Sequence, residues 1–546
     1  MSMSQKRWHM LLVIFVLFGI LLRGYNLNWG APFYFHPDER NIASSVSQLQ
    51  FPTQLNPHFF AYGTFPIYTT YAVAVVINSV TIIVRGVLTH TPIVSTSFFT
   101  IPFETAIIAS RVISFVLSCL VLVVIYKIGF SIGGKKTAVM SLILSVCSVG
   151  FIQFAHFGTF EMWLTLLTLL LFGSCLQLLK DQHPLYVFQT GLITGLLLAT
   201  KISSLALIPL PLLTLCWVLV KHKTVIRDIG KILLFLSITG ATFCVLSPYV
   251  FLDKTSFAAS MQYESSVAFG TLAVFYTGGF TGTTPVIYQF IHVYPFLINP
   301  FLTILLPVMF FVILYHAIRE RKTNLFLLLI FFLITFLSQA FLFVKWTRYM
   351  MPTLPYIYLM FGIVLSRNVR AYKRVKLFTV SFLCILSFLF AVLYVYGAFV
   401  SEDTRLVASD WARTHISKNA NILSEVYDLG IVPFNDRFRS ITLYNFYDIE
   451  NQKLPAQQVE DIISVYDYIV LPSQRILKTR LEHTDAFPQG NKVYHDLLLG
   501  KLGFIKIYQT PCPIWCRIVY LGDPIAHLEE TTSVFDRPVV IILKKI

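Results

Sequence analysis

The sequence predicts an α-helical multi-pass membrane protein with a soluble α/β domain at its C-terminus. Of the 546 residues, 56% are hydrophobic and 13% are charged, and the mean hydropathy is +0.70. Soluble domains contain about 25% charged residues. The charge also changes along the chain: residues 1–399 contain 26 Lys+Arg and 9 Asp+Glu (+17), whereas residues 400–546 contain 16 and 18 (−2). We therefore predict a membrane domain over 1–399 and a second domain over 400–546.

Eleven stretches of the first domain are apolar and long enough to cross a bilayer, which takes about 20 residues per helix. We predict transmembrane helices over residues 8–22, 107–126, 137–154, 160–179, 185–200, 203–220, 232–246, 296–316, 325–343, 350–365 and 377–398. A twelfth apolar stretch, residues 65–84, contains three threonines, an asparagine and a serine. These polar residues suit a helix at the membrane surface better than one surrounded by lipid.

The positive charges predict the orientation of these helices. Lys and Arg concentrate at residues 6–7, 127–136, 221–231, 319–322 and 367–376, always an even number of predicted spans apart, either two or four. Short loops rich in Lys and Arg stay on the cytoplasmic side. With 65–84 at the surface, the cytoplasmic loops carry 18 Lys+Arg and the outer loops 8, and the counts invert if 65–84 crosses. We expect a cytoplasmic N-terminus, with loop 24–106 and domain 400–546 outside the cell membrane, or in the lumen of the endoplasmic reticulum in a eukaryote.

The first predicted helix follows Lys6 and Arg7, as a signal peptide would. Residues 23–26 read Arg-Gly-Tyr-Asn and offer no small-residue cleavage site, so we expect this helix to be retained as an anchor. Six of the eight cysteines fall in predicted spans, where a thiol is a small apolar residue. Cys512 and Cys516 can pair if their compartment is oxidising, which the sequence leaves open. The chain has no Cys/His spacing typical of a metal site.

The C-terminal 147 residues have the composition of an ordinary soluble domain. Strands that alternate with helices indicate an α/β fold. We predict helices over 403–416 and 474–483 and strands over 421–427, 465–471, 504–508 and 539–543. This part contains no Gly-rich phosphate loop, nucleophile elbow or repeat, so its own function cannot be read from the sequence.

Two adjacent carboxylates, Asp38 and Glu39, follow the first predicted helix in the segment Tyr34-Phe35-His36-Pro37-Asp38-Glu39-Arg40. Ionisable residues close to a bilayer are costly, so they are functional candidates by default. These two could supply a general base, a ligand for a divalent cation such as Mg²⁺ or Mn²⁺, or both. The alternative is a solvated loop that contains an ion pair.

Other acids and bases from distant parts of the chain map to the same predicted outer surface. Taken singly, each could be explained by snorkelling or by anchoring at the membrane interface. Their convergence favours a site. The candidates are Arg111, Glu161, Lys201, Arg348 and Glu264, with the aromatic residues Trp163 and Tyr263 beside them.

The ordered set of motifs resembles glycosyltransferase family 39, which contains protein O-mannosyltransferases and lipid A aminoarabinose transferases. The resemblance covers about residues 8–400, and residues 65–84 resemble the juxtamembrane helices of that family. The segments that carry it are His36-Pro37-Asp38-Glu39, Ala109-Ser110-Arg111-Val112-Ile113-Ser114, Thr159-Phe160-Glu161-Met162, Thr200-Lys201 and Arg348-Tyr349-Met350-Met351-Pro352. Family members usually have Asp in place of Glu161, and the C-terminal domain does not resemble the β-trefoil of eukaryotic protein mannosyltransferases.

The resemblance implies the C-type glycosyltransferase (GT-C) membrane fold and a polyprenyl-phosphate sugar donor. A hydroxyl of a protein, lipid or glycan acceptor would attack the anomeric carbon on the outer face, with inversion. Asp38 is then the expected general base, and Glu39 and Glu161 would orient the acceptor or bind a cation. The leaving phosphate needs cationic donors. We expect these to be Arg40, Arg111, Lys201 and Arg348, and the substrate to be lined by Tyr34, His36, Trp163, Tyr263 and Glu264.

Three other classes of protein would leave different patterns in the sequence. A lipid or glycan transporter or flippase would carry charged residues in the middle of paired spans and an internal repeat, but the predicted span interiors here have almost no charge. A receptor or assembly scaffold would leave Asp38, Glu39 and Glu161 without a purpose. Nucleic-acid binding would need one continuous basic face, which scattered loops cannot make.

Overall fold

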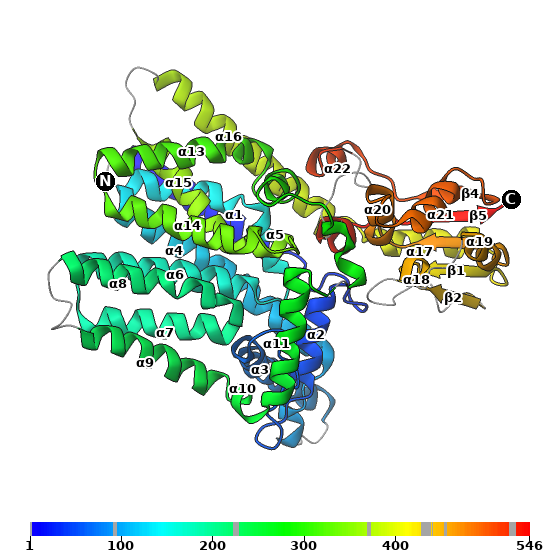
Figure 1. Cartoon of the computed structure of the whole chain (residues 1–546), viewed down its shortest axis with the longest axis horizontal. Coiled ribbons are helices and arrows are strands. Elements are labelled where there is room, and N and C mark those ends of the chain that lie inside the picture. Colours follow the sequence, from blue (N-terminus) through cyan, green and yellow to red (C-terminus); the bar gives the residue numbers. More distant parts are fainter. Residues whose placement is uncertain are drawn as a thin grey trace.

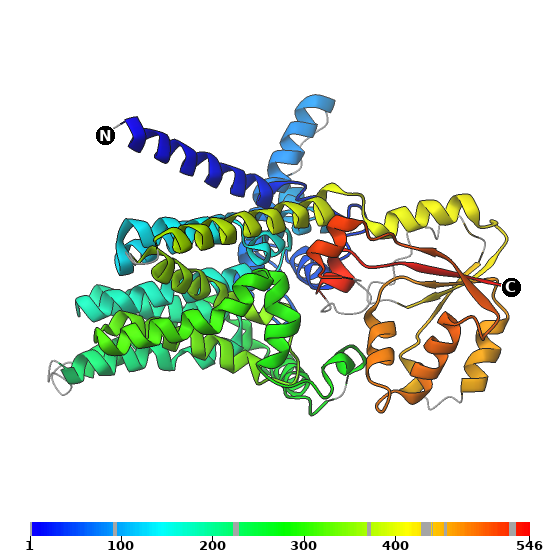
Figure 2. The same cartoon turned by 90° about the horizontal axis from the view of Figure 1, so that it is seen from above.

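The computed structural model describes residues 3–90, 95–221, 229–272, 274–367, 373–426, 438, 440–451, 456–522 and 531–546. Figures 1 and 2 show a bundle of long helices whose axes run in roughly one direction, with a sheet domain at one end of the bundle. We call this end the domain end. The N-terminus of the first helix lies at the opposite end (Figure 1).

All eleven predicted spans are helical. Nine helices in the described part of the chain are long and apolar enough to cross a membrane, and two shorter apolar helices join them, so the chain is a multi-pass membrane protein. These nine include residues 64–89, which contain the stretch predicted to lie at the membrane surface, and they count residues 103–146 as one helix. The helices of the bundle are α1 (Met3–Gly24), α4 (Phe103–Val146), α5 (Val149–His156), α6 (Glu161–Lys180), α7 (Pro184–Thr200), η2 (Ile202–Leu207) with α8 (Pro209–Lys221), α9 (Ile229–Leu246), α13 (Pro300–Arg319), α14 (Thr323–Ala340), η5 (Thr347–Thr353) with α15 (Leu354–Ser366), and α16 (Lys373–Val395) with η7 (Tyr396–Val400).

Helix α4 contains two of the predicted spans, which are joined by a tight turn. Gly134 has φ 77°, a left-handed conformation that favours glycine. A Cβ atom on Gly129 would lie 3.1 Å from the Cα atom of Ala138. In a continuous helix, nine residues would separate these positions by about 13 Å. The chain therefore reverses direction at Gly134, inside the basic cluster of residues 127–136.

The predicted basic loops also contact one another. Lys180 donates a hydrogen bond from Nζ to Ser131 Oγ (3.0 Å), which joins the end of α6 to the turn in α4. Glu320, after α13, forms ion pairs with Lys322 (2.7 Å) and with Arg367 after α15. The rest of the clusters at 221–231 and 367–376 lies partly outside the described residues.

Helix α3 (Thr64–Thr89) is apolar enough to span a membrane, but it runs across the bundle. Figure 1 shows it nearly end-on, and Figure 2 shows it projecting away from the bundle at the domain end. Its second half exposes Val76, Val80, Ile83 and Val87. The surface position of residues 65–84 stays a prediction, since the helix is also long and apolar enough to cross a membrane. The other elements between the bundle helices are α2 (Pro37–Ser47), η1 (Ser95–Phe99), α10 (Tyr249–Leu252), α11 (Lys254–Phe269), η3 (Phe275–Phe280), η4 (Gln289–Val293) and α12 (Tyr294–Leu297).

The C-terminal domain is a five-stranded mixed sheet with helices on both faces. The strand order is β2-β1-β3-β5-β4; β1 is parallel to β2 and β3, and β5 is antiparallel to β3 and β4. The strands are β1 (Asn421–Glu425), β2 (Ser440–Tyr444), β3 (Tyr468–Leu471), β4 (Phe504–Gln509) and β5 (Ile541–Lys545). The helices are α17 (Thr404–His415), α18 (Asp448–Asn451), α19 (Ala456–Ser464), α20 (Arg475–Glu482), α21 (Pro488–Leu498), α22 (Ile514–Val519) and the π-helical turn η8 (Thr531–Asp536).

The predicted α/β class of this domain is correct, and four of its strands lie where the sequence places them. Strand β2 and helices α19 and α21 were not predicted. Helix α17 packs on one face through Ala408 and Ala412, and α19 to α21 cover the other face. Cys512 and Cys516 form a disulfide.

A buried ion pair fixes the start of α2 against the bundle. Arg111 of α4 donates from Nε to Oε1 of Glu39 (3.0 Å) and from Nη2 to Oε2 (2.6 Å), and both side chains are fully buried. The backbone N–H of Gly158 also donates to Glu39 (2.6 Å). Arg111 donates from Nη1 to the carbonyl oxygens of Leu27 (2.9 Å) and Trp29 (2.8 Å). The pair therefore joins four parts of the chain: helices α2 and α4, the loop that follows α1, and the loop that precedes α6.

We expect Arg111→Ala to destabilise the protein by about 3–5 kcal/mol, because it leaves the Glu39 carboxylate buried without its cation. Thermal unfolding of the purified protein in detergent measures this loss. Arg85→Ala, which removes an exposed arginine of α3, is the matched control and should not change the unfolding temperature. Equal unfolding temperatures for the two variants would contradict this role of the pair.

Candidate functional site

Asp38 is held at the start of α2 by one neighbour on each side of its carboxylate. Pro37 is the first residue of α2, so Asp38 lies in the first turn, where the helix dipole favours a negative charge. The hydroxyl of Tyr62 donates to Oδ1 of Asp38 (2.6 Å), and Arg348 of η5 donates from Nη1 to Oδ2. The Asp38 side chain keeps 16% of its surface exposed. It is therefore oriented and still accessible.

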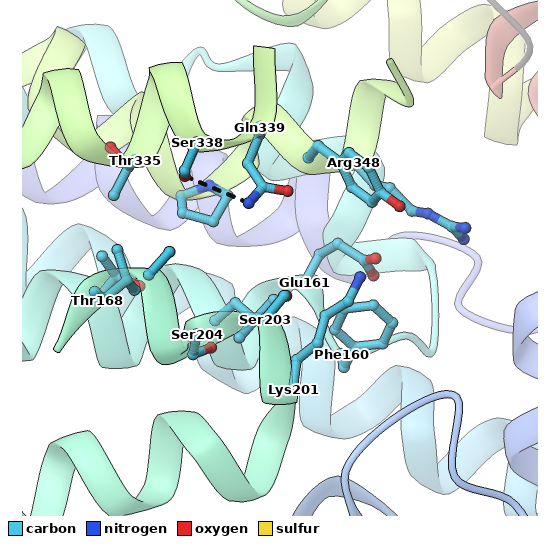
Figure 3. Close-up of a pocket in the computed structure, with 15 residues that line it drawn as sticks. Phe160, Glu161, Thr168, Lys201, Ser203, Ser204, Thr335, Ser338, Gln339 and Arg348 are labelled. Atoms are coloured by element: carbon cyan, nitrogen blue, oxygen red, sulfur yellow. Dashed lines mark hydrogen bonds between the residues drawn. The ribbon is translucent and has the colours of Figure 1, made fainter. Parts of the chain in front are cut away.

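Arg348 also lines a small pocket of about 50 Å³ in which Glu161 and Lys201 meet. Glu161 is the first residue of α6, and Lys201 occupies the turn between α7 and η2. Figure 3 shows the side chains of Glu161 and Lys201 pointing toward each other, with Arg348 on the neighbouring wall. The ammonium of Lys201 also lies over the rings of Phe160 (4.7 Å) and Tyr349 (4.8 Å). The pocket therefore combines one carboxylate with two cations.

The carboxylate of Glu161 is an unusual buried group. Its side chain is 2% exposed, and neither of its oxygens has a hydrogen-bond partner among the described residues. A buried carboxylate without such partners is costly. Since its oxygens lie in the wall of the pocket beside Lys201, hydroxyl groups of a bound molecule could satisfy them.

A larger cavity of about 480 Å³ adjoins this pocket and shares Lys201, Ser203, Gln339 and Tyr349 with it. Most of its lining is apolar, and Glu264 of α11 is its one acidic residue. Burial raises the pKa of Glu264, and the nearby Lys201 opposes that rise. The further apolar lining comes from Phe60, Leu198, Ile202, Leu205, Phe243, Val250, Phe257, Met261, Phe269 and Leu342.

Gly63 allows the segment before α3, which contains Tyr62, to pack against the turn that contains Lys201. Its N–H donates to the carbonyl oxygen of Thr200 (2.9 Å). A Cβ atom at this position would lie 1.9 Å from the carbonyl oxygen of Ala199, closer than any atoms can approach. Only glycine permits this contact. The close approach of Gly63 places its neighbour Tyr62, and with it Asp38, beside the pocket.

Tyr62 is buried, and its burial raises the pKa of its hydroxyl well above the ordinary value, with further contributions from Glu161 and Glu264. The hydroxyl therefore stays protonated and remains a hydrogen-bond donor to Asp38.

The structure brings together five of the predicted site residues: Asp38, Glu161, Lys201, Arg348 and Glu264. The other three charged residues of the predicted site lie elsewhere. Glu39 and Arg111 are buried against each other, and Arg40 donates to the carbonyl oxygen of Phe33 (2.9 Å) and lies over Phe103.

The remaining predicted lining residues pack against neighbours outside the two cavities. The ring of Tyr34 packs on Phe103, Trp163 packs on Phe65, and the hydroxyl of Tyr263 lies 3.0 Å from that of Tyr276. The ring of His36 lies between Phe157 and Phe535. Burial lowers the pKa of His36 well below its ordinary value, and Arg348, Arg111 and Arg405 lower it further.

The residues present do not match a divalent-cation site. Among the residues that the structure describes, no three His, Cys, Asp or Glu side chains form a group that could hold a metal ion. Both oxygens of Glu39 accept hydrogen bonds from Arg111. Glu161 stands next to Lys201, whose charge repels a cation.

Several pocket residues were not predicted. Tyr62 lies in a loop with no distinguishing motif. Ser338 and Gln339 form the pocket wall on α14, and a polar pair near the end of the apolar run 325–343 was the available signal. Thr335, one turn earlier on the same helix, lines the pocket too.

Comparison with known proteins identifies the fold. Neither protein-family models nor curated proteins match the sequence. Among solved structures, the oligosaccharyltransferase of Archaeoglobus fulgidus tethered with an acceptor peptide is similar at a TM-score of 0.51 and 12% identity, covering 99% of this chain and 89% of that one. The AglB oligosaccharyltransferase from the same organism, with an inhibitory peptide and a dolichol-phosphate, gives a TM-score of 0.50 at 12% identity, covering 100% and 89%. ArnT from Cupriavidus metallidurans bound to undecaprenyl phosphate gives 0.48 at 14% identity, covering 88% and 95%. At these identities the likeness concerns the fold, and the chain has the GT-C membrane fold of such glycosyltransferases.

Proposed function

We propose that this chain is a membrane glycosyltransferase that moves a sugar from a polyprenyl-phosphate donor to an acceptor hydroxyl, with inversion. The observation that carries the proposal is one cluster of charged side chains: Arg348 pairs with Asp38 and also lines the pocket that contains Glu161 and Lys201, beside a large apolar cavity. The fold supports it, because a similar structure holds a dolichol-phosphate.

In this proposal the donor spans both cavities. Its prenyl chain occupies the apolar cavity of about 480 Å³, where burial of each CH₂ contributes about 0.8 kcal/mol. Its phosphate lies between Lys201 and Arg348, the two cations in the pocket wall. As the bond to the sugar breaks, charge develops on the leaving phosphate, and cations fixed in a partly dry site stabilise that charge without reorganising.

Asp38 is the general base in this scheme. A hydroxyl is a poor nucleophile until its proton is taken, and a positioned carboxylate contributes about 10²–10⁴-fold to such a step. Tyr62 and Arg348 hold the carboxylate in one orientation. Inversion requires the acceptor to attack from the side of the sugar opposite the phosphate. Asp38 therefore takes the proton of the acceptor hydroxyl, and Lys201 binds the phosphate of the donor.

Glu161 and Glu264 then orient hydroxyl groups of the substrates. Glu161 has two buried oxygens without partners and lies beside the phosphate-binding Lys201. Accepting hydrogen bonds from sugar hydroxyls would remove the cost of its burial, so the donor sugar and the pocket stabilise each other. Glu39 and Arg111 position the loop without touching substrate, because each is occupied by the other.

We place the site on the outer face and the domain boundary at residue 400. Ser131 of the basic cluster 127–136 accepts a hydrogen bond from Lys180, and Glu320 of the cluster 319–322 pairs with Arg367; none of these residues lines the pocket. The disulfide between Cys512 and Cys516 supports an oxidising compartment for the C-terminal domain. The chain leaves the bundle after η7, which ends at Val400, and enters the sheet domain at Thr404.

We expect Asp38→Asn to lower the transfer rate by about 10²–10⁴-fold, because the amide cannot accept the acceptor's proton. The measurement is sugar transfer from polyprenyl-phosphate sugars by the purified protein, with membrane insertion and unfolding temperature compared in parallel. Asp485→Asn, an identical change at an exposed position of the C-terminal domain, is the control and should keep full activity. Normal turnover by Asp38→Asn would exclude Asp38 as the base.

We expect Lys201→Ala and Arg348→Ala each to raise the KM for the donor by about 10- to 100-fold, because each removes a charged hydrogen bond to phosphate. Donor titrations at saturating acceptor measure this. Lys254→Ala removes an exposed lysine at the start of α11 and should leave the KM unchanged. If donor kinetics stayed normal in both pocket variants, the phosphate site would have to lie elsewhere.

A further inference from the structure

The turn η8 (Thr531–Asp536) of the C-terminal domain is anchored to the bundle by side chains. Asp536 accepts hydrogen bonds at Oδ2 from Gln153 Nε2 of α5 (2.6 Å) and from the hydroxyl of Tyr394 of α16 (2.9 Å). The next residue, Arg537, donates from Nη1 to the carbonyl oxygen of Gly397 (3.2 Å). Asp536 is 6% exposed. These contacts fix the turn relative to two helices of the membrane domain.

From this anchored turn, Phe535 reaches the loop that carries the proposed base. Its ring centroid lies 4.6 Å from that of His36, and the other neighbour of His36 is Phe157 at 4.5 Å. Phe535 and His36 are 7% and 3% exposed. The imidazole is thus enclosed between one aromatic ring from the bundle and one from the C-terminal domain.

Arg405 of α17 fastens the same loop one residue earlier. Its guanidinium carbon lies 3.7 Å from the ring centroid of Phe35, which is fully buried. Asp403 accepts from Arg405 Nε (2.8 Å) and Nη2 (2.5 Å), and the carbonyl oxygens of Val534 (3.3 Å) and Phe535 (3.0 Å) accept from Nη1 and Nη2. One arginine therefore joins α17, η8 and the loop before α2.

We propose that the C-terminal domain positions the catalytic carboxylate: Phe535 and Arg405 hold Phe35 and His36, and so fix where α2 begins and where Asp38 points. This inference rests on the proposed role of Asp38. His36 is the N-cap residue of α2, and Asp38 follows after Pro37, whose φ is fixed by its ring. Only one residue with restricted freedom separates the enclosed imidazole from the base, so a shift of His36 is transmitted to Asp38.

The residues that line the two cavities show how positioning Asp38 differs from a general contribution of the C-terminal domain to the stability of the fold. Among the described residues, those lining the pocket and the large cavity come from positions 60–352, and none comes from the C-terminal domain. Loosening Phe535 or Arg405 therefore leaves the donor site intact and displaces the base. A misplacement of about 1 Å at a reacting group costs about 10²-fold in rate. The signature is a lower kcat at an unchanged donor KM.

The test compares Phe535→Ala and Arg405→Lys with Phe535→Tyr, which keeps the ring, and with Arg413→Ala, a partly exposed arginine of the same helix α17 that pairs with Asp410. We expect kcat to fall by about 10- to 100-fold in the first two variants, with the donor KM within about twofold of the wild type. Phe535→Tyr should restore most of the rate, and Arg413→Ala should not differ from the wild type. Arg405→Lys keeps the charge and serves if Phe535→Ala does not fold.

A second measurement does not depend on activity. Amide hydrogen exchange of the full-length protein should quicken in the first turn of α2 in Phe535→Ala and Arg405→Lys, and remain slow in Arg413→Ala. Unchanged kcat together with unchanged exchange in α2 would overturn the inference, as would a raised donor KM at normal kcat. If the wild type transfers no sugar, the proposed function fails, and the exchange data still decide whether the C-terminal domain holds α2.

Discussion

The arrangement of the site depends on one buried salt bridge, between Glu39 and Arg111. Its charges are removed from water, and their attraction compensates only because the geometry is bidentate and the backbone N–H of Gly158 and two carbonyl oxygens complete the hydrogen bonds. The pair joins the first loop to α4 and to the start of α6. Asp38 lies in the first turn of α2, next to Glu39, and Glu161 begins α6. A salt bridge that does not line the pocket therefore fixes the positions of both Asp38 and Glu161.

The pocket combines rigid and adaptable parts. Asp38 accepts hydrogen bonds from Tyr62 and Arg348, whereas the buried oxygens of Glu161 have no hydrogen-bond partner among the described residues. A group that already has hydrogen-bond partners is held in one orientation, while a buried group without them gains when a ligand reaches it. This contrast matches the division between a base, which must be aligned before the reaction, and a group that recognises hydroxyls. The large apolar cavity next to Lys201 would bury the prenyl chain of the proposed donor, and it offers few polar groups that could select one chain over another.

The sequence predicted the bundle well because apolar run length and positive loops report directly on the bilayer. It did not predict that α4 would continue through the turn at Gly134, or that strand β2, a short and half-exposed segment, would pair with β1. In the site, the family resemblance singled out Asp38 as the base, but the sequence did not predict that Glu39 would be buried against Arg111. Adjacent residues of a helix point about 100° apart, so one carboxylate contacts Arg348 beside the pocket and its neighbour contacts Arg111. Which one does so depends on how α2 is rotated, and that is decided by contacts with residues more than 70 positions away.

The ion pair between Asp38 and Arg348 joins residues 310 positions apart. During synthesis the first loop emerges early, but its arginine partner is made only after about two-thirds of the 546 residues. Lys201, and Thr200 whose carbonyl oxygen accepts the hydrogen bond from Gly63, are synthesised between these two residues. The pocket therefore cannot exist in the nascent chain until η5 has entered the membrane. Since η8 is made later still, an incomplete chain without it would lack the ring of Phe535 that packs on His36 beside the proposed base, even with every residue of the pocket in place.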